Sequence, residues 1–243
     1  MILEEEVKQD IDVILWSIRL ETIRRFFHLH FWENETLEAE FAKKVEKDPR
    51  LESVADHSWH ICDIILLIAR HFPELDENKC IKLAILHDKM EIITGDLKPI
   101  GRDGTGKNTF AFDKQKKEKK ELSEKDAIKK YLSKLPFSAR QQQSELLSEV
   151  LNCTTNEAKF VKAIDKLQVL AFIHNKKQGD IKNKHLKFTL KYAKKAIQFF
   201  PGIESHYNEL SIRIIDQVAE KRSQKRADIE KLISTKQLGL FDF

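Results

Sequence analysis

The sequence is poor in the residues that turn a polypeptide chain. Seven glycines and five prolines in 243 residues are about half of the ordinary usage. Folds built from many short strands need frequent turns, so this composition argues against β-sandwiches and barrels. It favours a mostly helical protein, and the chain is long enough to bury a sizeable core without disulfides.

Cysteines and long apolar runs are also scarce. Cys62, Cys80 and Cys153 are odd in number, lie far apart and form no Cys-x-x-Cys pair, which predicts reduced thiols in a cytoplasmic protein. The N-terminus is acidic, whereas a signal peptide begins with basic residues followed by an apolar stretch. The longest clean apolar run, 64–69, is far below the ~18 residues that a membrane span needs, so we expect no membrane contact.

The charge balance narrows the class of partner. Forty-three basic and 39 acidic residues leave a formal net charge of +4, with a pI of about 8.8. This mild positive excess suits anionic small molecules. It is too small to indicate nucleic-acid binding by itself.

Apolar residues at helical spacing recur along most of the chain. The clearest interruption is the segment 95–106, which holds four of the seven glycines. We predict one all-α domain over residues 1–232 and an exposed C-terminal peptide over 233–243. The helices are expected at about 4–32, 53–71, 78–94, 114–134, 138–151, 157–175, 186–199 and 203–232.

The first chemical signal is His87-Asp88, an imidazole and a carboxylate at the end of an apolar helix. Both are metal ligands, and burying such a pair without a partner is costly. Glu91 is three and four residues further on, which would place it on the same helix face. Asp96 follows Gly95, where a turn can bring it back toward the pair.

Further ligands must come from other helices. His57 stands in the first turns of an apolar helix, and Asp165 has apolar neighbours that suggest an inward position. Taken singly, His57 is more often a hydrogen-bonded histidine, and Asp165 could pair with Lys162 or Lys166. Together with His87-Asp88 they make two imidazoles and two carboxylates, a set suited to a divalent metal that promotes hydrolysis.

These residues resemble the His…His-Asp…Asp signature of the HD-domain phosphohydrolases. The segments 52–58 and 87–97 resemble, more closely, the bacterial 5'-deoxynucleotidase branch and its eukaryotic HD-domain relatives. The resemblance implies a helical HD-domain bundle, here with extra N- and C-terminal helices. It implies one divalent ion (Co²⁺, Mn²⁺, Fe²⁺, Zn²⁺ or Mg²⁺), hydrolysis of deoxyribonucleoside 5'-monophosphates and, in many members, a homodimer.

The resemblance also assigns roles to residues. It makes His57, His87, Asp88 and Asp165 the metal ligands, and Glu91 and Asp96 the acid/base and water-orienting carboxylates. It calls for an upstream arginine that holds the phosphate. Arg25 is the nearest match, with Arg24 and Arg50 as alternatives, because the segment 34–49 resembles an insertion before His57.

Two other functions remain open from the sequence. One is a different HD-type phosphohydrolase, acting on a nucleoside triphosphate, a cyclic nucleotide or an alarmone. The other is a helical binding module that is tethered to the replication clamp and keeps a residual metal site. The complete ligand set with Glu91 and Asp96 argues against the second.

The C-terminal peptide carries its own motif. Gln237-Leu238-Gly239-Leu240-Phe241 resembles the short segment by which bacterial replication proteins dock on the sliding clamp. Gln237 would be a polar anchor, assisted by Leu238, and Leu240 and Phe241 would fill an apolar pocket. The alternative is a tail that folds back onto its own core.

Overall fold

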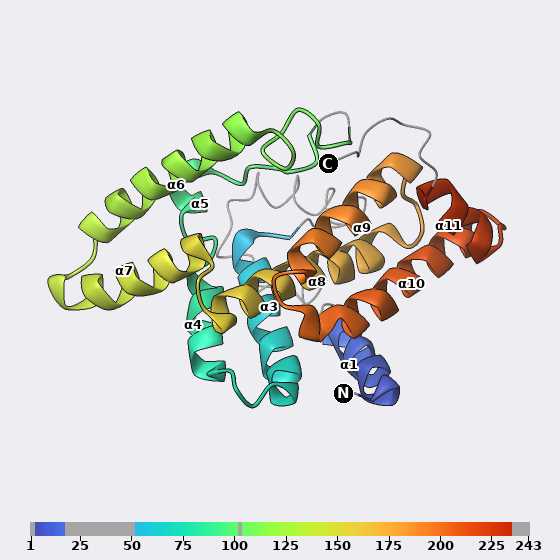
Figure 1. Cartoon of the computed structure of the whole chain (residues 1–243), viewed down its shortest axis with the longest axis horizontal. Coiled ribbons are helices and arrows are strands. Elements are labelled where there is room, and N and C mark those ends of the chain that lie inside the picture. Colours follow the sequence, from blue (N-terminus) through green and yellow to red (C-terminus); the bar gives the residue numbers. More distant parts are fainter. Residues whose placement is uncertain (1–2, 18–51, 102–103, 235–243) are drawn as a thin grey trace, which may run out of the picture.

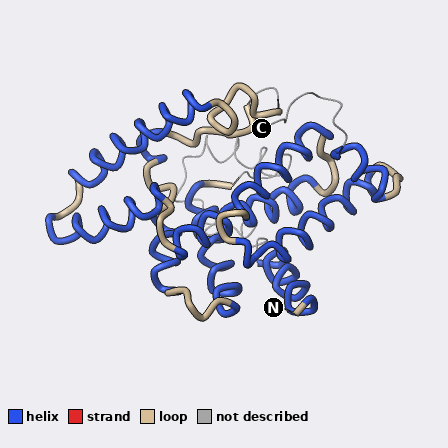
Figure 2. Tube along the Cα trace, in the orientation of Figure 1, coloured by secondary structure: helices blue, strands red, loops and turns tan. Residues whose placement is uncertain are grey.

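The computed structural model describes residues 3–17, 52–101 and 104–234, and every regular element in these ranges is a helix (Figures 1 and 2). This confirms the prediction of an all-α protein. None of the described helices is both long and apolar enough to cross a bilayer. The elements are α1 (Glu4–Ser17), α3 (Val54–Ile68), η3 (Ala69–His71), α4 (Glu77–Leu86), α5 (Glu91–Thr94), α6 (Lys114–Ser133), α7 (Phe137–Asn152), α8 (Asn156–Lys177), α9 (Asn183–Ile197), η4 (Pro201–Ile203), α10 (Glu204–Lys221) and α11 (Arg226–Ser234).

Helix α8 runs through the centre of the bundle and packs against α3, α4, α9 and α10 (Figure 1). Its apolar side chains Phe160, Ile164, Leu167 and Leu170 are fully buried. Each such side chain contributes about 1.5–3 kcal/mol on burial. Because α8 is held on several sides, any residue on its surface has a well-defined position.

Helix α3 begins with a capping box. The Ser53 side chain accepts a hydrogen bond from the Asp56 backbone amide, and the Asp56 carboxylate accepts one from the Ser53 amide. His57, in the first turn, lies on the same face as the buried isoleucines of the helix, which include Ile61 and Ile64. The cap and the apolar stripe together direct His57 toward α8.

The prediction of one helix over 78–94 is wrong. Helix α4 ends at Leu86, a turn follows, and α5 begins at Glu91. In this turn, hydrogen bonds between residues three positions apart replace the four-position bonds of an α-helix. They run from the Lys89 amide to Leu86 O and from the Glu91 amide to Asp88 O. His87 and Asp88 therefore lie in a turn at the end of α4, not on the face of a continuous helix.

The prediction of one helix over 203–232 is also wrong. Helix α10 ends at Lys221, and Ser223 takes a left-handed conformation (φ 52°) that reverses the chain before α11. The Gln224 amide then bonds Ala219 O, as in a Schellman turn. A bidentate ion pair between Arg226 and Asp216 holds α11 against α10. The sequence shows neither glycine nor proline at this break.

Several of the sequence predictions, including the insertion at 34–49 and most of the peptide 233–243, lie wholly or partly outside the described residues. Helix α1 confirms the first part of the helix expected at 4–32, and residues 18–32 fall outside. Arg25, with its alternatives Arg24 and Arg50, also falls outside. So do the clamp-motif residues Gln237, Leu238, Leu240 and Phe241.

Candidate metal centre

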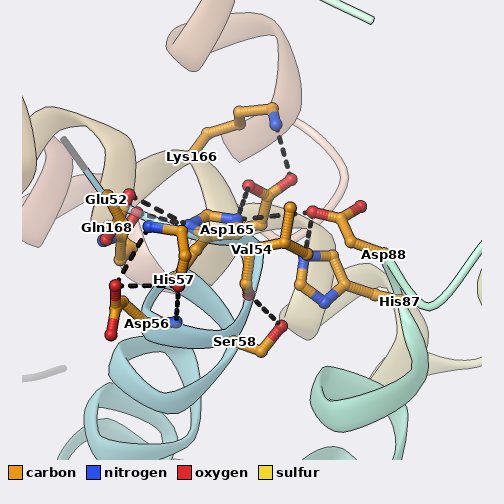
Figure 3. A network of polar contacts seen from close by, with 11 residues as sticks. Glu52, Val54, Asp56, His57, Ser58, His87, Asp88, Asp165, Lys166 and Gln168 are labelled. Atoms are coloured by element: carbon orange, nitrogen blue, oxygen red, sulfur yellow. Dashed lines mark hydrogen bonds and ion pairs between the residues drawn. The ribbon is translucent and has the colours of Figure 1, made fainter. Parts of the chain in front are cut away.

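The structure brings together the four predicted metal ligands from three parts of the chain (Figure 3). His57 comes from α3, His87 and Asp88 from the turn after α4, and Asp165 from the middle of α8. The rings of His57 and His87 have centroids 5.3 Å apart. Their mutual approach depends on the break at Leu86, which turns His87-Asp88 toward α3 and α8.

The distances between donor atoms suit a common cation. His57 Nε2 lies 3.3 Å from Asp165 Oδ1 and 3.6 Å from Asp88 Oδ2, and His87 Nε2 lies 3.0 Å from Asp88 Oδ2. Ligands about 2.1 Å from one metal ion are separated by ~3.0–3.4 Å in octahedral or tetrahedral geometry. The donor atoms of His57, His87 and Asp88 all lie within 4.8 Å of one another, and Asp165 contacts this group through His57.

His87 supplies the clearest sign of a missing partner. Its Nδ1 donates to the backbone carbonyl of Ala84 at 2.6 Å, which leaves Nε2 to face the centre. Among the described residues, this buried Nε2 makes no hydrogen bond, and its contact with Asp88 Oδ2 at 3.0 Å is an ion pair only when the ring is protonated. A buried nitrogen without a hydrogen bond is costly, and coordination to a metal ion would remove that cost.

The electrostatics of the centre favour an added positive charge. Burial lowers the pKa of both imidazoles, but the carboxylates around them outweigh this effect, raising the pKa of His57 to about 9 and also raising that of His87. Burial likewise disfavours the charged form of Asp165, yet Lys166 and the two histidines hold the pKa of that carboxyl below its ordinary value. A divalent cation would replace the imidazolium protons and satisfy both carboxylates, so the residues present fit the metal that the sequence predicts.

Lys166 contacts the centre directly. Its Nζ lies 2.6 Å from Asp165 Oδ2, the carboxylate oxygen that does not face His57 (Figure 3). Of the two lysines that the sequence offered as partners for Asp165, the structure therefore selects Lys166. Lys162 instead places its ammonium over the ring of Phe199, 4.0 Å from the centroid.

Glu91, at the start of α5, lies near the candidate ligands His87 and Asp88, whose charges act on it. Its pKa is raised to about 7, first by burial and then by the negative charges of Asp88 and Asp96. Asp96 is exposed and follows Gly95, whose φ of +70° turns the chain out of α5. The charges of Asp88 and Asp96 thus both act on Glu91, although the helical face expected to align Glu91 with His87 is interrupted.

The residues that contact His57 on its Nδ1 side, away from the other candidate ligands, were not identified from the sequence. Gln168 is fully buried, and its Oε1 lies 2.7 Å from His57 Nδ1. The amide of Gln168 in turn donates to Glu52. Gln168 follows Asp165 by three residues on α8, so the spacing of these two polar residues in an apolar helix was the available signal.

The comparison with known families agrees with this geometry. A family described as HD domain matches residues 45–205, which is more than half of the chain and contains all four candidate ligands. This chain belongs to the HD-domain family. The match also contains Glu91, Asp96, Gln168 and Glu52.

Curated relatives of this HD-domain chain are named 5'-deoxynucleotidases. The protein HDDC2 of Mus musculus is 31% identical over 142 residues, covering 58% of this chain and 62% of the relative. The protein hdd1 of Schizosaccharomyces pombe is 33% identical over 121 residues, covering 49% and 56%. HDDC2 of Dictyostelium discoideum is 32% identical over 141 residues, covering 55% and 68%. The chain thus spans about half to two thirds of the length of these relatives.

Proposed function

We propose that this chain is a metal-dependent 5'-nucleotidase that hydrolyses deoxyribonucleoside 5'-monophosphates to a nucleoside and phosphate. The observation that carries the proposal is the convergence of two imidazoles and two carboxylates, His57, His87, Asp88 and Asp165, with the carboxyl of Glu91 beside them. The names of the relatives support the choice of substrate.

The four converging side chains would hold one divalent ion, with Co²⁺, Mn²⁺, Fe²⁺, Zn²⁺ and Mg²⁺ as the candidates. Such an ion lowers the pKa of a bound water and neutralises phosphate charge. Lys166 adds a cation that its contact with Asp165 holds next to the centre. On the resemblance, Arg25 would clamp the phosphate oxygens in a bidentate fork.

Glu91 is suited to move the proton during hydrolysis. A carboxyl with a pKa of about 7 can accept a proton from the attacking water at neutral pH. As the water oxygen bonds to phosphorus, the bond to the 5'-oxygen breaks, and the proton held on Glu91 passes to that leaving oxygen. Asp96, next to Glu91, would orient the water.

A panel of metals against nucleotides tests the proposal. The purified chain is stripped of metal, reloaded with each of the five ions and assayed for phosphate release from deoxy- and ribonucleoside monophosphates, triphosphates, cyclic nucleotides and an alarmone. We expect release from the deoxyribonucleoside monophosphates and complete loss in chelator. Turnover that survives chelation would refute the metal centre, and release from triphosphates, cyclic nucleotides or the alarmone alone would favour a different HD-type hydrolase.

Two variants sharpen this experiment. Asp88→Ala should lose both the bound metal and the turnover while remaining folded, because it removes one ligand from the edge of the core. Asp126→Ala, on exposed α6, is the matched control and should keep both. A fully active Asp88→Ala would remove Asp88 from the ligand set.

The remaining predictions from the sequence join this proposal. We propose a cytoplasmic location, a homodimer, an HD-type domain over 1–232, and docking of the peptide 233–243 on a bacterial sliding clamp. Their support is the composition, the family resemblance and the motif at Gln237 to Phe241. Light scattering of the purified chain tests the dimer.

A further inference from the structure

His57 has two chemically different sides in this structure. Its Nε2 faces Asp165 and Asp88, and its Nδ1 faces Gln168 Oε1 at 2.7 Å, with Glu52 Oε2 beyond hydrogen-bond distance at 3.7 Å (Figure 3). A histidine can bind a metal through Nε2 only when that nitrogen is unprotonated, which places the ring proton on Nδ1. The group that accepts the Nδ1 proton therefore decides how readily His57 becomes a ligand.

The orientation of the Gln168 amide follows from its other neighbour. The amide has one end that only donates and one end that only accepts. Its Nε2 donates to a carboxylate oxygen of Glu52, and a carboxylate can only accept. The acceptor end, Oε1, is thereby directed at His57, so the hydrogen bond across 2.7 Å requires a proton on Nδ1.

His87 is also held with its ring proton on Nδ1, but by a backbone carbonyl instead of a side chain. His87 donates its Nδ1 proton to the carbonyl of Ala84, three residues earlier in its own chain segment. Both rings thus present Nε2 to the centre. For His87 the local backbone is sufficient, whereas His57 depends on a side chain that is 111 residues away in the sequence.

We propose that Gln168 is a positioning residue for the metal centre, which holds His57 in the Nδ1-protonated form, and that Glu52 sets the orientation of the Gln168 amide. The inference rests on the metal site of the proposed function and goes beyond it, because it concerns metal affinity. Burial reinforces the effect. Gln168 is fully buried and the Glu52 side chain is largely covered, so water is a poor substitute for either.

Metal affinity of the chelator-stripped protein is the readout that tests this proposal. Mn²⁺ binding is measured by titration calorimetry at fixed pH for the wild type, Gln168→Leu and the control Gln143→Leu. The control also removes a glutamine that accepts a side-chain hydrogen bond, from Tyr131 Oη, but on α7. We expect Gln168→Leu to bind Mn²⁺ ~10–100-fold more weakly and Gln143→Leu to match the wild type.

Thermal unfolding of the metal-free proteins separates positioning from general stability. A positioning role predicts that Mn²⁺ raises the melting temperature of Gln168→Leu much less than that of Gln143→Leu. If Gln168→Leu does not fold, Glu52→Gln serves in its place, since it keeps the shape but lets the Gln168 amide reverse, and its Mn²⁺ affinity should fall several-fold. Mn²⁺ affinity within two-fold of wild type in the folded variant would overturn the inference.

The outcome is independent of nucleotide hydrolysis. Weakened Mn²⁺ binding in Gln168→Leu, with no nucleotide hydrolysed by the wild type, would retain the inference and remove the proposed function. Unchanged Mn²⁺ binding in that variant, with deoxyribonucleotides hydrolysed by the wild type, would remove the inference alone.

Discussion

Replacing Glu91 by glutamine tests the proton-transfer role at the candidate centre. The substitution keeps the size of the side chain and removes its ability to take a proton. Positioned acid/base groups contribute ~10²–10⁴-fold to rate, so kcat of Glu91→Gln should fall by about that factor. Metal affinity should remain at the wild-type level, because Glu91 is not one of the four candidate ligands. Glu145→Gln, an exposed residue on α7, is the matched control and should behave as the wild type.

The raised pKa of Glu91 predicts what fraction of this carboxyl is ionised at each pH. With a pKa of about 7, roughly a tenth of this carboxyl is ionised at pH 6 and about nine-tenths at pH 8. A carboxyl with the ordinary value near 4.5 would be almost fully ionised at both. Carboxyl ¹³C shifts of the metal-free protein measure the difference, and we expect a titration with its midpoint near pH 7 that is absent in Glu91→Gln.

The pH dependence of activity should also report the ionisation of Glu91. The base must be ionised to accept a proton, so the rate falls as the pH falls through the pKa of Glu91. A bound divalent ion stabilises the ionised form, which sets the acidic limb of the pH profile between 4.5 and about 7 at saturating metal. Glu91→Gln should lack this limb. A variant with near wild-type turnover, or with the same limb, would refute the role of Glu91 as the base.

Three further predictions concern the rest of the chain. Asp10 is buried on α1 and binds side chains from η3 and α10, so Asp10→Ala should lower the free energy of unfolding by about 3 kcal/mol in urea denaturation. Asp12, on the same helix, makes an exposed ion pair with Arg213 of α10, so Asp12→Ala should lower it by less than about 1 kcal/mol. Equal losses would contradict the importance of burial. Burial raises the pKa of Cys80 to about 12, so at pH 8 its thiol should react with maleimide only after unfolding. A Leu240→Ala, Phe241→Ala double variant should lose binding to a cognate sliding clamp while retaining turnover, and equal binding by variant and wild type would remove the docking proposal.

Much of the helical frame followed from local sequence patterns. The segment 53–71 was predicted from its apolar spacing, and the structure confirms it as α3 followed by η3. The capping box at Ser53 and Asp56 acts within one turn, which is why the start of this helix can be recognised locally. The two long predicted helices that proved to be broken show where this approach fails. Both breaks depend on single turns without glycine or proline, at His87-Asp88 and at Ser223.

At the candidate metal centre, the sequence alone predicted which residue types could serve as ligands. His57, His87-Asp88 and Asp165 stand out because polar residues in apolar helices need partners. The sequence did not predict the distances between the ligands or the pairing of His57 with Gln168, because these contacts join side chains on separate helices. It also did not predict which of the two lysines on α8 pairs with Asp165. Local sequence determines which residues can serve as ligands. Only the packing of α3 and α4 against α8 decides which atoms meet, because those contacts join residues far apart in the sequence, 111 positions for His57 and Gln168, and are made by side chains whose directions depend on the whole bundle.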